Sequence, residues 1–440
     1  MNSKRISLVV FAFVFLICSF AAFYPSHHPL AEEGAFNAGD LAWMLTASAM
    51  VLIMTPGLSF FYGGMVKPKN IISTLLQSFV ALGMISLVWY SVGFSLAFGE
   101  SIGGFIGNPF TYFMMDNVGT APEALLSPGI PFILFAAFQL KFAIITPALI
   151  TGSMAERVRF WGYLVFMVLF CLFVYCPLAH WTWHPEGFLR KWGVLDFAGG
   201  TVVHISAGVA ALAGSLFLGP RKQLSREIST PNVPYVMLGT GLLWFGWFGF
   251  NAGSALGSNT LAIEAFVNTN LASASAMITW MIFEAIRGKK PSALGACVGA
   301  VVGLVAITPA AGFVSFRPSL LIGCIAAIVS NYAVHWKNNS GAIDDTLDVF
   351  PCHGVGGITG MLLTAVFAKE VGLTSGQTTT FLYHLLGLAI VLIFTFVVSY
   401  GLYVLTNFIT RIRVSEKHEA LGLDLSQHGE SVYEEALETV

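Results

Sequence analysis

Charged residues are scarce in this chain of 440 residues. Asp, Glu, Lys and Arg together make up 10% of it, whereas a soluble domain carries about a quarter. Hydrophobic residues account for 56%, and the mean hydropathy is +0.77. These values exclude an ordinary soluble domain and predict an integral membrane protein.

The chain also lacks a surplus of positive charge and a cysteine framework. Its formal net charge is −2, and nucleic-acid binding requires a basic face, so nucleic acid is not an expected partner. The six cysteines lie in apolar runs without metal-binding spacing or a pairing pattern. We therefore expect no disulfide framework, no metal site and no cofactor.

Residues 1–22 have the arrangement of a secretory signal peptide. Lys4 and Arg5 precede an apolar run from Ile6, and small residues follow around Ser19 and Ala21. The alternative is an uncleaved membrane helix, because a run of about 18 residues is long enough to span. A polar external lead-in is expected from there to about Gly39.

Eleven apolar segments follow within residues 40–410, each long enough to cross a hydrocarbon core of about 30 Å. They are Leu41–Tyr62, Ile71–Phe98, Ile130–Met154, Tyr163–Trp183, Phe197–Leu218, Val233–Ser254, Leu261–Ile286, Ala293–Val314, Leu320–Trp336, Val349–Phe367 and Phe381–Ile409. The sequence therefore predicts an all-α integral membrane protein with eleven transmembrane helices, ending in a soluble tail over 411–440.

Basic residues distinguish the two sides of this bundle. One set of loops carries Lys67, Lys69, Arg157, Arg159, Arg221, Lys222, Arg226, Arg287, Lys289, Lys290, Lys337, Arg411, Arg413 and Lys417. The other side keeps only Arg190, Lys191, Arg317 and Lys369. The positive-inside rule makes the first side cytoplasmic. We therefore predict a multi-pass protein of the plasma (inner) membrane, with the N-terminus outside and the C-terminus in the cytoplasm.

Two membrane segments repeat one pattern, in which an acid, an apolar interval and a histidine precede glycines. They are Asp196 to His204 and Asp348 to His353. Asp196 is the predicted N-cap of its helix. The predicted orientation runs the fifth helix inward and the tenth outward, so the histidines should approach each other near the midplane. This parity is compatible with a pseudo-twofold inverted 5+5 repeat plus one extra helix, in which the site lies between the halves.

Several longer motifs resemble one family. They are Pro56-Gly57 with Phe61–Gly64, Phe138-Gln139 to Phe142 leading into Ala155-Glu156-Arg157, Asp196 to His204, Gly246 to Ser254, and Asp348 to Gly354. Between about Ala42 and Tyr433 the chain resembles the Amt/MEP/Rh ammonium transporter family, on the Amt side.

This resemblance implies roles for particular residues. It implies twin pore histidines at His204 and His353, and two stacked gate phenylalanines at Phe142 and Phe250. An external recruitment site falls on Phe142, Trp183 and Ser254, with Asp196 close to it. No catalytic residue is implied, because the activity is transport and not an enzymatic reaction.

The resemblance also implies partners. The family forms homotrimers with one pore per subunit. The blocks Gly422–Asp424 and His428–Tyr433 resemble a tail that couples subunits and contacts a PII-type signalling protein in bacterial relatives. Residues 411–440 are therefore a predicted regulatory tail, although composition alone favours disorder.

The chemistry of these residues favours ammonium transport. Aromatic faces attract a cation, and the Ser254 hydroxyl accepts a hydrogen bond that potassium cannot donate. A bare cation inside a bilayer is costly, so ammonium should lose its proton and cross as ammonia beside two neutral imidazoles, with or without a separate proton relay.

Other interpretations remain open. Most aromatics in such a chain only pack, and for Asp196 we favour a capping role over direct cation contact. The function could instead be that of a non-conducting or weakly conducting ammonium sensor. A neutral NH3/CO2 gas channel is a further alternative, although it has no need of a cation-binding tryptophan at position 183. A zinc enzyme needs three ligands, and no third ligand shares the context of the two histidines.

Lys141 and Glu264 are unexpected charges within predicted membrane helices. Since a buried lysine needs a partner or water, we hypothesise that the two side chains form a structural pair. If Lys141 instead faced the outer cavity, its charge would repel ammonium.

Overall fold

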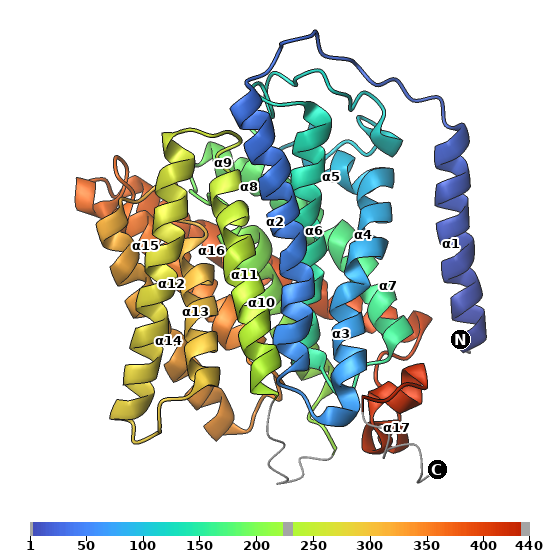
Figure 1. Ribbon diagram of the computed structural model, residues 1–440. Coiled ribbons are helices and arrows are strands. Elements are labelled where there is room, and N and C mark those ends of the chain that lie inside the picture. Colours follow the sequence, from blue (N-terminus) through green and yellow to red (C-terminus); the bar gives the residue numbers. More distant parts are fainter. Residues whose placement is uncertain (1–2, 223–231, 433–440) are drawn as a thin grey trace.

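The computed structural model describes residues 3–222 and 232–432, which form a helical bundle (Figure 1). The bundle helices are α2 (Ala38–Gly63), α3 (Ile71–Phe79), α4 (Ala81–Val88), η2 (Trp89–Gly93), α5 (Phe94–Phe98), α6 (Phe132–Met154), α7 (Phe160–Phe170), η4 (Cys171–Tyr175), α8 (Cys176–Trp183), η5 (Gly200–Ile205), α10 (Ser206–Leu218), α11 (Val233–Gly253), α12 (Thr260–Ile286), α13 (Ala293–Ile307), α14 (Phe316–Ser340), η6 (Phe350–Val355), α15 (Gly356–Phe367) and α16 (Thr379–Ile409).

Short elements connect these helices. They are η1 (Pro68–Asn70), the antiparallel pair β1 (Ser101–Ile102) and β2 (Ile106–Gly107), η3 (Phe113–Met115), α9 (Phe188–Lys191), η7 (Leu373–Ser375), and the tail helices α17 (Glu416–Leu421) and η8 (Asp424–His428). We call the face at which α2 begins the upper face and the face that carries α17 the lower face, as in Figure 1.

The predicted membrane segments all form helices. Among the described residues, 11 helices are long and apolar enough to cross a membrane; α1 (Ser3–Phe23) is one of them, and the others coincide with predicted segments. The predicted segment Ala293–Val314 forms the shorter α13, because the helix gives way to turns after Ile307. With α13 added to the ten long helices other than α1, the described chain forms an eleven-helix membrane bundle, and α1 is an additional N-terminal helix.

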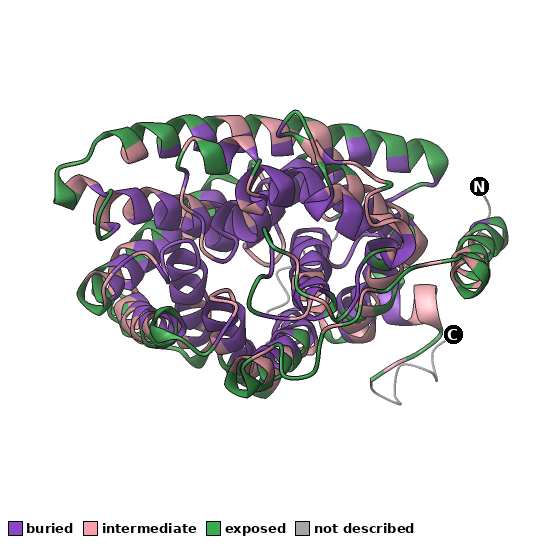
Figure 2. Cartoon of the chain, turned by 90° about the horizontal axis from the view of Figure 1, so that it is seen from above, coloured by how far each residue is buried: buried purple, intermediate pink, exposed green. Residues whose placement is uncertain are grey.

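The helix contacts follow the predicted inverted repeat. The first and sixth membrane helices, α2 and α11, pack along each other. In the first half α6 packs on α10, and in the second half α13 packs on α15; α10 also contacts η6, while α15 contacts η5. Seen from above, buried residues face the inside of the ring, and the long α16 lies across one side of it (Figure 2).

The two histidine helices meet through glycines. A Cβ atom on Gly208 would lie 2.2 Å from the Gly354 backbone nitrogen, a separation that real side chains do not adopt. Only glycine allows this backbone approach. Each helix begins with a π-helical stretch, η5 or η6, just after a residue with positive φ, Gly199 (120°) or Asp348 (58°). Together these features fix the place of the histidines between the two halves.

The N-terminal helix stands apart from the bundle in Figure 1. Only 6% of its apolar window is buried, and it contacts α7 and, through Phe20, the Phe113 ring of η3. Its large side chains, such as Phe11 and Leu16, are more than half exposed. The helix α1 therefore buries little surface against the bundle.

The tail packs against the lower face. Val414 donates its N–H to the Arg157 carbonyl at 3.0 Å, and the Asp424 carboxylate accepts from the N–H groups of Ile72 and Ser73 at 3.0 and 2.7 Å. The described part of the tail is therefore ordered, unlike the expectation from composition alone. The predicted tail residues from Tyr433 onward, like Arg226 of the basic loops, lie outside the described residues.

Candidate functional site

A cavity of about 410 Å³ opens on the upper face of the bundle. Its lining includes the four residues of the predicted recruitment site, Phe142, Trp183, Ser254 and Asp196. They come from α6, the end of α8, the end of α11 and the loop before η5. Tertiary packing thus brings together side chains that are more than a hundred residues apart in the sequence.

Stacked aromatic rings form the floor of this upper cavity. The Phe142 ring meets Trp183 edge-on, with ring centroids 5.8 Å apart. It lies over Phe250 at 4.2 Å with an interplanar angle of 34°. Phe142 and Phe250 are fully buried, so the rings separate the upper cavity from the interior.

Trp183 and Ser254 have defined hydrogen-bond partners in this cavity. Trp183 donates its indole N–H to the Asp196 carbonyl at 3.2 Å. Ser254 donates its hydroxyl to the Phe250 carbonyl at 2.9 Å. Because that bond uses the hydroxyl proton, the oxygen lone pairs of Ser254 remain available as acceptors.

Asp196 has the predicted capping role. Its carboxylate accepts the backbone N–H groups of Gly199, Gly200 and Thr201 at 2.8, 2.6 and 2.7 Å, and the Thr201 hydroxyl also donates to it. These bonds satisfy amides that would otherwise be unpaired at the start of η5. The Asp196 carboxylate lines the cavity, but its two oxygens already accept hydrogen bonds from the protein.

The two histidines lie side by side beneath the rings. Their ring centroids are 5.5 Å apart, and their Nδ1 atoms are 3.3 Å apart. One Nδ1 must carry a proton and the other must accept it, which suits two neutral imidazoles. The His204 ring also stacks on Trp247, with ring centroids 5.3 Å apart, and its Nε2 atom has no hydrogen-bond partner within residues 3–222 and 232–432.

The passage beside the histidines is narrow and otherwise apolar. A void of about 10 Å³ is bounded by Phe250, His204 and His353 together with aliphatic and aromatic side chains. This is about the space of one water-sized particle. The histidines are the polar groups on its wall, apart from the Trp247 indole, which donates its N–H to Thr308.

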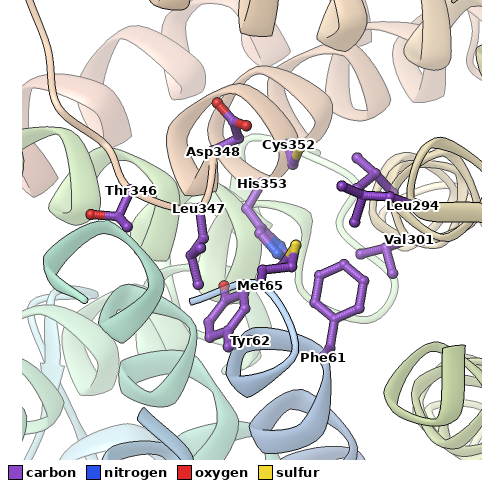
Figure 3. Close-up of a pocket in the computed structure, with 11 residues that line it drawn as sticks. Phe61, Tyr62, Met65, Leu294, Val301, Thr346, Leu347, Asp348, Cys352 and His353 are labelled. Atoms are coloured by element: carbon purple, nitrogen blue, oxygen red, sulfur yellow. The ribbon is translucent and has the colours of Figure 1, made fainter. Parts of the chain in front are cut away.

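A second cavity, of about 200 Å³, lies on the lower side of the histidines. Figure 3 shows the His353 ring among the residues that line it, which include Phe61, Tyr62 and Asp348. His353 borders both this cavity and the narrow void. The order from the upper face is therefore cavity, ring pair, histidine pair and cavity.

The acid that caps the second histidine helix is Asp345, not Asp348, the acid of the predicted acid-to-histidine pattern. Asp345 accepts the Phe350 N–H at 2.7 Å, whereas Asp348 pairs with Lys337 at 2.6 Å. Burial raises the pKa of Asp345 to about 6. The spacing from Asp345 to His353 equals that from Asp196 to His204, so Asp345 and not Asp348 is the counterpart of Asp196 in the second half.

The predicted pair of Lys141 and Glu264 does not form. Glu264 pairs instead with Lys369 at the upper face, where both side chains are partly exposed. Lys141 is half-buried on α6, has no ion-pair partner in the described part of the chain, and is not among the residues that line the upper cavity. The prediction was wrong because helix rotation, which the sequence did not specify, directs the two side chains to different surroundings.

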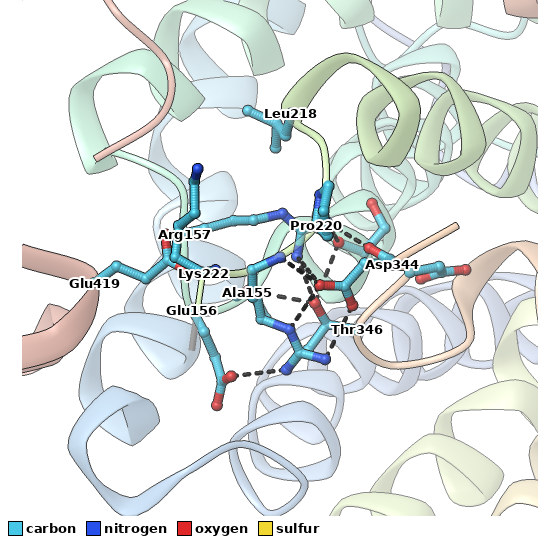
Figure 4. Close-up of polar contacts among 12 residues, drawn as sticks. Ala155, Glu156, Arg157, Leu218, Pro220, Lys222, Asp344, Thr346 and Glu419 are labelled. Carbon is cyan, nitrogen blue, oxygen red and sulfur yellow. Dashed lines mark hydrogen bonds and ion pairs between the residues drawn. The ribbon is translucent and has the colours of Figure 1, made fainter. Parts of the chain in front are cut away.

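A charged cluster on the lower face was not predicted as a site. Figure 4 shows Arg157, Glu156, Asp344 and Thr346 within it. Arg221 bonds Asp344 at 2.9 Å and Glu156 at 2.7 Å, and Arg157 donates to Thr346 at 2.8 Å. Burial lowers the pKa of Arg157 to about 10; burial alone would raise the pKa of Asp344, but its bonds with Arg221 lower it.

This cluster joins the tail to the loop that precedes the second histidine helix. Glu419 of α17 pairs with Arg413 at 3.0 Å and accepts the Lys222 N–H, next to Arg221. Asp344 and Thr346 belong to the loop that lines the lower cavity. The motif Ala155-Glu156-Arg157 was the available sequence signal, but its partners lie far along the chain.

These features define an α-helical multi-pass membrane protein whose upper and lower cavities converge on a buried histidine pair. The chain belongs to the Ammonium Transporter Family, whose sequence model matches residues 42–433. This confirms the family predicted from the motifs.

Individual relatives support the same assignment. The chain is 46% identical over 409 residues to an ammonium transporter of Aquifex aeolicus, covering 92% of this chain and 95% of that protein. The crystal structure of Candida albicans Mep2 superposes with a TM-score of 0.83 at 36% identity, covering 92% of this chain and 93% of that one. A structure described as a sensor Amt protein gives a TM-score of 0.82 at 31% identity, covering 89% and 98%.

Proposed function

We propose that this protein transports ammonium by recruiting the cation at the upper cavity and passing ammonia through the interior. One observation carries the proposal: two cavities on opposite faces are separated by a stacked ring pair and a histidine pair in an otherwise apolar passage. That arrangement suits a small solute that is charged outside and uncharged inside.

Recruitment rests on the groups that converge at the upper cavity. The faces of Trp183 and Phe142 attract a cation, by about 1 kcal/mol or more when desolvated. The Ser254 oxygen, whose proton is engaged with Phe250, accepts a hydrogen bond from ammonium. Potassium offers no such bond, so the same site discriminates between cations of similar size.

Passage requires that the solute lose its charge. Placing a bare cation in an apolar passage costs much free energy, whereas neutral ammonia requires only hydrogen-bond partners. We propose that ammonium gives up its proton to water in the upper cavity and that ammonia crosses beside His204 and His353. The proton follows separately through the hydrogen-bonded histidine pair and rejoins ammonia in the lower cavity, so that one positive charge crosses with each ammonia. The two imidazoles supply the hydrogen bonds that the aliphatic walls lack.

Two other functions share parts of this evidence. The likeness to a sensor Amt protein means that the fold alone does not separate a conducting protein from a sensor. Transport is favoured because the lower cavity reaches His353. A channel for a neutral gas would not require a cation-binding aromatic site such as the one at Trp183 and Phe142.

We expect Trp183→Leu to raise the half-saturating ammonium concentration by about fivefold, since about 1 kcal/mol of cation–π attraction is lost. The measurement is the current of purified protein in proteoliposomes on a solid-supported membrane after ammonium and potassium pulses. Trp336→Leu, at a half-exposed tryptophan on α14, is the matched control and should leave the value unchanged. An ammonium pulse that moves no charge in the wild type would favour the sensor or the gas channel.

We further propose that the upper face is external and that the lower face, with the tail, is cytoplasmic in the plasma (inner) membrane. The basic loops of the lower face support this orientation. Residues 1–22 are proposed to be a signal peptide, residues 40–410 the transport domain and residues 411–440 a regulatory tail. The loose contact of α1 with the bundle supports its removal. A homotrimer and a PII-type partner are proposed from the family resemblance.

Deleting residues from Gly422 onward should change regulation without removing the pore. The deletion takes away Asp424, which binds the start of α3, but leaves α17, Glu419 and all the membrane helices. Ammonium current should persist, and its response to an added PII-type protein should be lost. A truncated protein that no longer inserts into membranes would contradict this division.

A further inference from the structure

The upper cavity contains a positive charge of its own. Arg190 of α9 is exposed and lines the cavity together with Phe142, Trp183 and Ser254. It is the only basic residue in that lining. Its guanidinium donates a hydrogen bond to the carbonyl of Trp183, the last residue of α8, at 3.1 Å. This bond holds the guanidinium charge beside the recruitment rings.

No carboxylate of the described residues forms an ion pair with Arg190. Asp196 is the acid of the same cavity, but three backbone amides and a hydroxyl of η5 already bind its oxygens. An ammonium ion in the cavity therefore meets a guanidinium that no carboxylate contacts directly, while the Asp196 carboxylate is held at the start of η5.

The upper face as a whole is acidic, in contrast to the positive charge of Arg190. Acidic residues outnumber basic ones in its loops and helix ends: the acids are Glu32, Glu33, Asp40, Glu100, Asp116, Glu123, Glu186, Asp196, Glu264 and Glu370, and the bases are Arg190, Lys191, Arg317 and Lys369. Such a face raises the local concentration of cations. Arg190 opposes that attraction only at the last step, inside the cavity.

We propose that Arg190 weakens the binding of ammonium at the recruitment site and promotes its loss of a proton. A nearby like charge disfavours the charged form of a titrating group, and here that group is the ammonium itself. One N–H bond breaks, the proton passes to cavity water, and neutral ammonia, which the guanidinium does not repel, enters the passage. This inference rests on the proposed transport function for its expected effect on the maximal current, but not for its expected effect on ammonium binding.

Arg190→Gln is the direct test, because glutamine still offers an amide donor to the Trp183 carbonyl but carries no charge. For a like-charge repulsion in a solvent-filled cavity, we expect the half-saturating ammonium concentration to fall about fivefold. The maximal current should fall by a similar factor, because the bound cation gives up its proton less readily. Both differences should shrink at high ionic strength.

Two matched variants separate charge from position. Arg190→Lys keeps the charge and should behave as the wild type. Lys191→Gln removes the neighbouring exposed charge, which does not line the cavity, and should change little. A purely positioning role would raise the half-saturating concentration in Arg190→Lys and Arg190→Gln alike, and that result, or wild-type values in Arg190→Gln, would overturn the proposal.

Equilibrium binding keeps this inference apart from the transport proposal. Purified Arg190→Gln protein should bind radiolabelled methylammonium about fivefold more tightly than the wild type, whether or not either conducts. Tighter binding together with absent currents in both proteins would leave the charge effect standing and remove the transport mechanism. Equal binding in the two proteins would refute the role of Arg190 even if currents are large.

Discussion

Replacing His353 or His204 by alanine is expected to lower the ammonium current by at least about tenfold. Each imidazole provides hydrogen bonds in a passage whose walls are otherwise almost wholly apolar. Leaving a polar solute without a partner costs roughly 1–3 kcal/mol, and about 1.4 kcal/mol corresponds to a factor of ten in rate.

The two substitutions should not be additive. The Nδ1 atoms are 3.3 Å apart, so either single change already breaks the pair and leaves the other ring without its partner. A double variant is therefore expected to be scarcely worse than either single variant. Additive losses would mean that the two rings act independently.

The measurement is the ratio of ammonium to potassium current in proteoliposomes that contain equal amounts of protein. His335→Ala is the control, since His335 lies on α14 and bonds Asn339 in an exposed setting. It should retain the wild-type ratio. Unchanged ammonium currents and ratios in both pore variants would contradict passage beside the histidines.

Asp196→Ala and Asp345→Ala are expected to destabilise the protein by about 3 kcal/mol or more each. Both carboxylates hold the N-terminus of a histidine helix, and both are buried. Their removal leaves backbone amides unpaired inside the protein, which costs more than the loss of an exposed cap.

Asn259→Ala provides the comparison. Asn259 caps α12 by accepting the Ala262 N–H at 3.0 Å in an exposed position, and its loss should cost about 1 kcal/mol. Thermal unfolding in detergent, followed by circular dichroism, ranks the three variants. If Asp345→Ala were as mild as Asn259→Ala, the matching roles of Asp196 and Asp345 in the two halves would be wrong.

Local properties of the chain predicted much of the fold. Most limits of the apolar segments agree with the observed helices within a few residues, as for Leu41–Tyr62 and α2, but Ala293–Val314 ends early, at Ile307. Length and hydropathy suffice for this, because a spanning segment must be apolar and must satisfy its backbone internally. Asp196 could likewise be predicted as a cap, since it precedes the residues whose amides it binds.

The errors arose where partners lie on other elements. Glu264 finds Lys369 and not Lys141, and Arg221 joins Glu156 to Asp344 across three loops. Asp348 is the acid of the sequence pattern before His353, yet it pairs with Lys337, and Asp345 caps the helix. Arg190 was counted only as a loop charge, although it lines the same cavity as Trp183.

The sequence by itself determined the membrane class, the positions of the spanning helices and, through its motifs, the family. These follow from local length, apolarity and residue order. Tertiary structure alone decided which charges pair, which acid holds the second histidine helix and which cation borders the upper cavity. The physical reason is that a helix apolar on nearly all sides has no face marked by its sequence, so its rotation and neighbours are set only when the helices pack.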